Sequence, residues 1–155
     1  MTAVAEQIHA DIDALKELRD ALTRFRHAQR EVVERGDDEI RATRASLEAK
    51  AAQWRSLLAR REAEFAACQL AAAAEAATGR PADCSAEASA VREAQERLDH
   101  IRRWQQRVED EASTFRGSSG RFRDVLELDL PRTENHLLAI ITGLEAARGL
   151  QVAGS

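Results

Sequence analysis

Two cysteines, Cys68 and Cys84, are the only ones in the 155-residue chain, and they flank its sharpest turn signal, Gly-Arg-Pro at 79–81. A disulfide requires Cα atoms within about 7 Å of each other. The loop between the cysteines can cover that distance by folding back along the preceding helix. We therefore predict a disulfide that staples the tip of a helical hairpin. The alternative is two free thiols in a reducing cytosol, with Cys68 as a small core residue.

No other set of residues has the spacing of a catalytic, metal-binding or cofactor-binding motif. Glu6 and His9 form a Glu-x-x-His pair, but a di-iron bundle needs this motif on two helices, and the chain has no second copy. The cysteines are too far apart for a zinc knuckle, and no glycine-rich phosphate loop or Gly-x-Ser-x-Gly is present. We predict a non-enzyme with no catalytic residue, no metal site and no cofactor.

The charge pattern argues against nucleic acid as a partner. The chain carries a net charge of -4, and its charged residues make up 32% of the total. The densest group of basic residues is interleaved with acids, which is typical of the solvated outer face of a coiled coil. We predict no nucleic-acid binding. The basic group consists of Arg97, Arg102, Arg103 and Arg107, beside Trp104.

The chain contains no segment expected to insert into a membrane. Its longest apolar run is far shorter than the roughly 20 residues that span a bilayer. The first 20 residues show neither the basic nor the apolar region of a Sec signal peptide. The sequence therefore predicts a cytoplasmic protein, or one that is exported by a route independent of a signal peptide.

Apolar residues recur at alternating steps of three and four along both halves of the chain, which predicts long helices of coiled-coil type. This period passes through Gly36 without a break and predicts a first arm over about 5–78. The first-arm positions are Leu15, Leu18, Leu22, Phe25, Val32, Gly36, Ile40, Leu47, Ala51, Trp54, Leu58, Phe65 and Cys68.

The segment 79–84 is predicted to be the tip between two arms. Gly79 can end the first helix in a left-handed cap, and Pro81 cannot continue it. Asp83 or Ser85 can cap a second arm over about 85–148. In that arm the poor helix formers at 116–121 predict an interruption, and Pro131 predicts a kink.

These elements predict one all-α domain over 1–155, an elongated antiparallel helical hairpin or coiled coil. A fold-back at Pro81 would bring Gly36 opposite Leu126. The competing interpretation is a compact four-helix bundle that is broken at Gly36.

A two-helix hairpin buries one stripe on each arm, and several large apolar residues lie outside the predicted stripes. Most of these residues fall toward the open end, where both termini lie. Such a face needs another helix, either from a second copy or from a different protein. We predict that the partner interface includes Ile8, Ile12, Val33, Leu128, Leu138 and Ile141.

A hairpin of this kind resembles the Trp-X-Gly proteins of type VII secretion systems and the N-terminal helical domains of related toxins. The resemblance is one of architecture: a helical hairpin with Trp54 near the middle of its first arm, no Sec signal peptide and a face that lacks a partner. In this chain Trp54 is followed by Arg55 and Ser56. The resemblance implies a secretion-associated component and assigns no functional residue.

The first functional hypothesis is therefore a non-enzymatic module for protein–protein interaction, with a structural, adaptor or secretion-associated role. Its partner would be another protein or a homo-oligomer, bound through helices at the open end. The alternative is a compact helical bundle that binds a small ligand or a metal between its helices.

Overall fold

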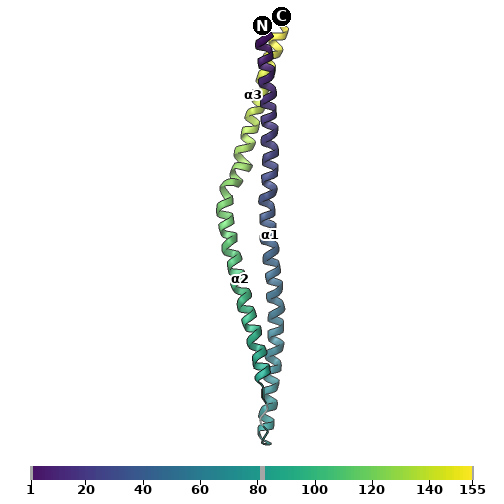
Figure 1. Ribbon diagram of the computed structural model, residues 1–155, viewed down its shortest axis with the longest axis vertical. Helices are drawn as coiled ribbons and strands as arrows, with labels where there is room; N and C mark the ends of the chain where they lie inside the picture. Colours follow the sequence, from purple (N-terminus) through teal and green to yellow (C-terminus); the bar gives the residue numbers. More distant parts are fainter. Residues whose placement is uncertain (1, 81–82, 155) are drawn as a thin grey trace. The chain divides into compact units, whose positions relative to one another are not determined.

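The computed structural model describes residues 2–80 and 83–154, and these residues form a hairpin of long helices. The first arm is α1 (Thr2–Ala76). The second arm consists of α2 (Ser85–Asp124), the π-helical segment η1 (Val125–Asp129) and α3 (Leu130–Ala153) (Figure 1). The described residues contain no strand. The predicted all-α antiparallel hairpin is confirmed.

Gly36 lies inside α1, and the helix continues through it. The alternative fold, a four-helix bundle broken at Gly36, is therefore wrong. A Cβ atom at Gly36 would lie only 2.7 Å from Cζ of Phe115 on the second arm. The missing side chain thus makes room for an aromatic ring, and this packing opposes the cost of about 1 kcal/mol for a glycine inside a helix.

This close contact predicts different outcomes for two glycine substitutions. Gly143→Ala should stabilise the protein by about 1 kcal/mol, because alanine favours the helix and a Cβ there meets nothing within 4 Å. Gly36→Ala should stabilise it less or destabilise it, because the new Cβ displaces the Phe115 ring. Urea unfolding followed by circular dichroism compares the two. Equal stabilisation by both substitutions would contradict the assigned contact.

The first arm ends in a Schellman motif, as the sequence predicts at Gly79. Gly79 has a φ of 83°, the left-handed conformation that glycine adopts without steric cost. Its N–H donates to the carbonyl of Ala76 at 3.3 Å, and the N–H of Arg80 donates to the carbonyl of Glu75 at 3.2 Å. These two bonds satisfy carbonyls that the end of a helix leaves without partners. Pro81, the expected helix breaker, lies outside the described residues.

The start of α2 is capped from the loop. The N–H of Ala88 donates to the carbonyl of Cys84 at 3.0 Å, and the N–H of Ser85 donates to Oδ1 of Asp83 at 2.9 Å. Hydrogen bonding from Ser85 lowers the pKa of the Asp83 carboxyl. Asp83 is therefore the residue whose side chain caps this end.

The irregularity in the second arm lies between the two predicted positions. Residues 116–121 are α-helical, so the expected interruption there is wrong. Phe115 and Phe122, which flank this segment, are half-buried, and their packing overrides the weak helix propensity of the segment. The departure from α-helical geometry is η1 at Val125–Asp129, where the N–H of Leu130 bonds to the carbonyl of Val125. Pro131 follows directly, and it has no N–H to donate to an α-helical ladder.

The chain divides into two compact units, each built from both arms. Unit 1 comprises Met1–Asp37 with Phe115–Ser155, and unit 2 comprises Asp38–Thr114. In unit 1 the arms are antiparallel, since Lys16 pairs with Glu145 and Arg26 pairs with Glu134. The buried apolar residues of unit 1 are Ile12, Leu126, Leu137 and Ile141.

Unit 2 has its own apolar cluster. Ala51 from α1 packs with Leu98 and Ile101 from α2, and all three are buried. Leu47, Trp54 and Leu58 cover this cluster as partly buried neighbours.

The register between the arms differs from the expected one. Gly36 contacts Phe115 instead of Leu126, because α2 begins beside Cys68 and not beyond the end of α1. The inward face of α1 in unit 1 also differs from the predicted one, because Leu18, Phe25 and Val32 are exposed. The buried or half-buried positions are Ile8, Ile12, Leu15, Arg19, Leu22, Thr23, Arg26, Gln29, Val33, Gly36 and Asp37.

Candidate functional site

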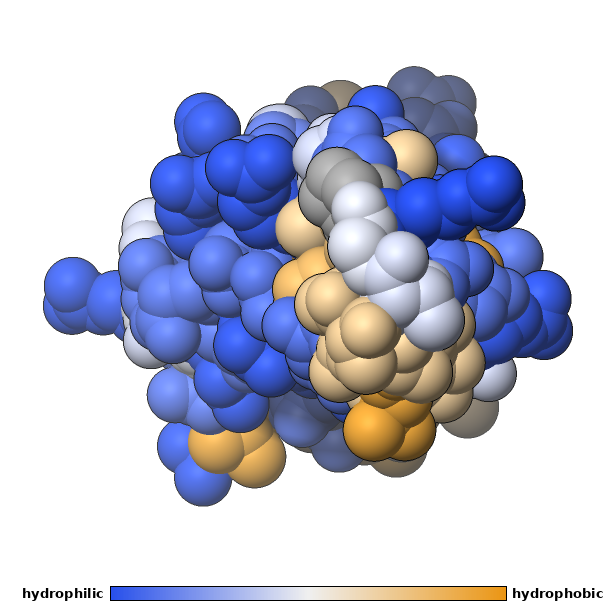
Figure 2. Space-filling view, turned by 90° about the horizontal axis from the view of Figure 1, so that it is seen from below, coloured by the Kyte–Doolittle hydropathy of each residue, from blue (hydrophilic) through white to orange (hydrophobic). Residues whose placement is uncertain are grey.

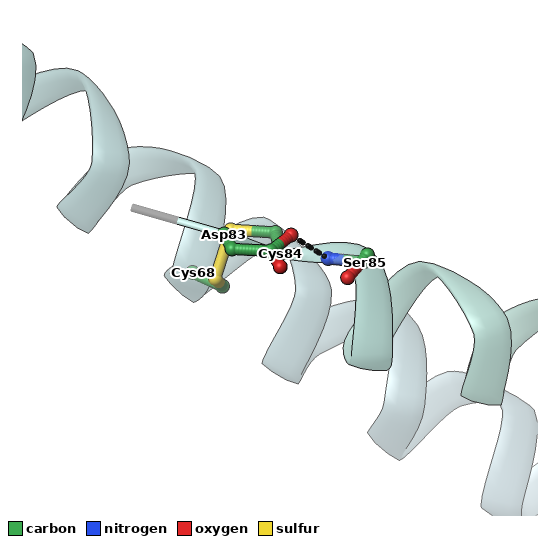
Figure 3. Close-up of a disulfide and its surroundings, with 4 residues drawn as sticks. All are labelled: Cys68, Asp83, Cys84 and Ser85. Carbon is green, nitrogen blue, oxygen red and sulfur yellow. Dashed lines mark hydrogen bonds between the residues drawn. A yellow bond between two sulfur atoms is a disulfide. The ribbon is translucent and has the colours of Figure 1, made fainter. Parts of the chain in front are cut away.

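The tip of the hairpin is closed by a disulfide between Cys68 and Cys84, whose Cα atoms lie 5.9 Å apart. Figure 3 shows Cys84 in the loop directly before α2, with the Asp83–Ser85 hydrogen bond beside it. The disulfide places the start of α2 against Cys68, which lies two turns before the end of α1. It is therefore the covalent bond that fixes the register within unit 2.

Beyond Cys68 the last two turns of α1 expose an alanine-rich surface. Leu70 is 75% exposed, and almost all the alanines between it and Thr78 are exposed as well. Figure 2, which views the molecule from below, shows this apolar surface as pale orange to orange. This surface offers hydrophobic contact.

A buried ion pair crosses the two arms of unit 1. Glu134 is 6% exposed, and its carboxylate accepts hydrogen bonds from Nε and Nη2 of Arg26 at 3.0 and 3.1 Å. Arg19 donates from Nε to the backbone carbonyl of Glu134 at 3.2 Å. The hydrogen bonds from Arg26 lower the pKa of Glu134, against the opposing effect of burial. All the strong donors and acceptors here are paired, so the cluster is structural.

The lowered pKa of Glu134 predicts an acid-sensitive unit 1. An unfolded glutamate titrates near pH 4.3, and the folded carboxyl titrates below that value. The stabilisation is therefore complete above about pH 4.3 and is lost as the pH falls through the folded pKa. Thermal unfolding between pH 3 and pH 7 should show a smaller acid-induced loss in Glu134→Gln than in the wild type. Identical pH profiles would contradict the assignment.

The described residues show no cluster of metal-ligating side chains. No group of three or more His, Cys, Asp or Glu side chains among them could hold a metal ion. A surface pocket of about 230 Å³ in unit 2 is lined by Arg44, Leu47, Glu48, Gln105 and Glu109. Its Arg44 and Glu109 are paired at 2.6 Å, and its Glu48 is paired with Arg55 at 2.7 Å, so each charged lining residue already has a partner. No described helix is long and apolar enough to cross a membrane.

The residues of the predicted partner interface differ in their exposure. Ile12 and Ile141 are 1% and 4% exposed, so they belong to the core of unit 1 and their prediction as interface residues is wrong. Both lie on the inward faces of their arms. Leu128 and Leu138 are exposed. Ile8 and Val33 are half-buried on the inward face of α1.

The larger exposed apolar group was not predicted. Leu18, Phe25 and Val32 were placed on the inner stripe, yet each is about half exposed, at 49%, 47% and 51%. They lie seven residues apart and so share one face of α1. Two of the inward positions in this region are Arg19 and Arg26. Because arginine is charged, the hydrophobicity pattern favours the row of Leu18, Phe25 and Val32 as the inner stripe.

Trp54, on which the architectural resemblance rests, is half-buried in unit 2. The guanidinium groups of Arg61 and Arg97 lie 5.8 and 6.0 Å from the centroid of its ring. Arg61 lies on α1 with Trp54, whereas Arg97 lies on α2, so the contact with Arg97 joins the two arms through cation–π attraction. Both contacts give Trp54 a packing role inside the hairpin.

Comparison of the chain with protein-family models, with curated proteins and with solved structures finds no match.

Proposed function

We propose that the chain is a non-enzymatic module that binds other helices through the exposed apolar side chains of unit 1. The observation that carries this proposal is the half-exposed row of Leu18, Phe25 and Val32 on one face of α1. Large apolar side chains that recur every seven residues on a helix are the signature of a face that packs on another helix.

The second arm of unit 1 also exposes large apolar residues. Leu128 and Leu138 are 52% and 45% exposed. Their burial against a partner would remove apolar area from water, which is the main driving force of association. A structural, adaptor or secretion-associated role fits such a surface, since each of these roles needs contact and no chemistry.

The disulfide bears on where the protein acts. Disulfides persist in oxidising compartments and are rare in a reducing cytosol. As part of this proposal, the Cys68–Cys84 bond favours a protein that acts in an oxidising compartment. In the alternative, the protein is cytoplasmic, and Cys68 and Cys84 are free thiols in the reducing cytosol.

Photo-crosslinking in the cell of origin tests the proposal. A photoreactive amino acid in place of Phe25 should form adducts with a polypeptide, because this side chain lies on the proposed contact face. The same amino acid in place of Gln53, an exposed polar position in unit 2, serves as the control and should form few. Absence of polypeptide adducts at Phe25, Leu18 and Leu138 would overturn the proposal.

A further inference from the structure

The exposed row on α1 is part of a complete second stripe. An alanine precedes each of its three large residues, so that the spacing alternates between four and three, as in a coiled-coil seam. Every member is exposed. We call this stripe the outer seam; it consists of Ala14, Leu18, Ala21, Phe25, Ala28 and Val32.

The outer seam is distinct from the face that packs against the second arm. Each of its positions precedes an inward position by one residue, as Leu18 precedes Arg19 and Phe25 precedes Arg26. One residue corresponds to a rotation of about 100° around the helix axis. A helix in a four-helix bundle contacts two neighbours at about such an angle. In unit 1 the second arm supplies only one of these two neighbours.

The residue sizes in the outer seam are self-complementary in one direction only. In an antiparallel pair of α1 helices, Phe25 lies opposite Ala21 of the second copy, and Leu18 lies opposite Ala28. Val32 then lies opposite Ala14. Each large side chain thus meets a small one, which fills space evenly. A parallel pair would stack phenylalanine on phenylalanine and leave voids at the alanine layers.

The charges at the ends of the outer seam favour the same register. Asp11 ends the seam on one side and Arg35 ends it on the other. The antiparallel register that matches the six apolar residues also brings Asp11 opposite Arg35 of the second copy, twice by symmetry. A parallel pair would bring Asp11 against Asp11 and Arg35 against Arg35, which repel each other.

We infer that unit 1 forms a two-fold symmetric antiparallel dimer through the outer seam of α1, so that the helix recognised by this surface is a second copy of the same chain. This inference rests on the proposed function and names its partner. Such an interface is isologous, because the same surface is used by both copies. It spans about 27 Å of helix, so the dimer is expected to be weak, with a dissociation constant in the micromolar range.

Cysteine crosslinking tests the direction of the helices, since the native cysteines are already joined to each other. The dimer axis lies near Thr23, so Arg24→Cys should crosslink to its own copy through a short bismaleimide, at about 3 Å along the helix. Glu17→Cys and Glu31→Cys should each fail to do so, at about 18 and 24 Å. A mixture of these two variants should crosslink to each other. Crosslinking of all three single variants to themselves would establish a parallel pair and overturn the inference.

Sedimentation from about 1 μM to 1 mM tests the dimer itself. Phe25→Glu should weaken it by at least about 100-fold, because each dimer contains the charge twice. Leu70→Glu, at another exposed apolar position in unit 2, is the control and should leave the dimer unchanged. Asp11→Arg should weaken the dimer, and Arg35→Asp added to it should restore the affinity. A dimer that is insensitive to Phe25→Glu would overturn the inference.

A wild-type chain that stays monomeric at 1 mM would also overturn the inference, because about 1 mM lies far above a micromolar dissociation constant. That result would leave the proposed function standing if Phe25 still crosslinks in the cell to a polypeptide of different sequence. The masses of the crosslinked adducts therefore separate the failure of the dimer from the failure of the wider proposal.

Discussion

Loss of the Cys68–Cys84 disulfide will lower the free energy of unfolding of unit 2 by about 3 kcal/mol. The cysteines lie 16 residues apart, and closing a loop of this size removes conformational freedom from the unfolded chain. The alanine-rich end of α1 offers little side-chain packing to compensate. Urea unfolding of Cys68→Ser/Cys84→Ser, with amide exchange in unit 2 as a local readout, measures the loss.

The matched control for this prediction is the effect of a reductant on the two proteins. Reductant should destabilise the wild type to the level of the double-serine variant and leave the variant itself unchanged. Equal stability of the wild type with and without reductant would show that the cysteines are not joined in solution. The loss of protection should be confined to the neighbourhood of the tip and the Ala51 cluster of unit 2.

Glu134→Ala will destabilise unit 1 by about 3 kcal/mol. The substitution leaves the Arg26 guanidinium, which is 20% exposed, without the carboxylate that binds it in a bidentate pair. It also opens space at a position that is 6% exposed. Thermal and urea unfolding at neutral pH measure this effect.

The control for this ion pair replaces both partners. Arg26→Met combined with Glu134→Leu removes both charges and fills the space with apolar groups, which is often neutral or stabilising for a buried pair. The double variant should therefore recover most of the stability lost in Glu134→Ala. If Glu134→Ala alone is harmless, the pair is solvated and the burial assigned to it is wrong.

The sequence predicted the hairpin because its signals are local. Helical periodicity, the Gly79 cap and the cysteines on either side of the turn each act within a few turns of chain. Such local signals could not decide whether α1 continues through Gly36, since a glycine can either break a helix or leave space for a side chain of another helix. Only the long-range contact with Phe115 shows that Gly36 leaves space for an aromatic ring of the second arm.

The inward face of α1 could not be predicted because α1 carries two stripes with the same period in unit 1. Leu18, Phe25 and Val32 are more apolar than Arg19 and Arg26, so a pattern of hydrophobicity selects the wrong stripe. The two arginines are stable on the inward face because Glu134, more than 100 residues away, binds both. Its carboxylate pairs with Arg26, and its backbone carbonyl accepts a hydrogen bond from Arg19. This long-range compensation has no local sequence signal.

The outer seam is expected to be open in the single chain and covered by a second copy on association. Hydroxyl-radical footprinting of Phe25 at increasing protein concentration tests this most directly, with Leu70 as the internal reference. We predict rapid oxidation of Phe25 in dilute protein and protection as the concentration passes the dissociation constant, while oxidation of Leu70 stays constant. Protection of Phe25 at every dilution would contradict the exposed seam, and rapid oxidation at every concentration would contradict its coverage by a second copy.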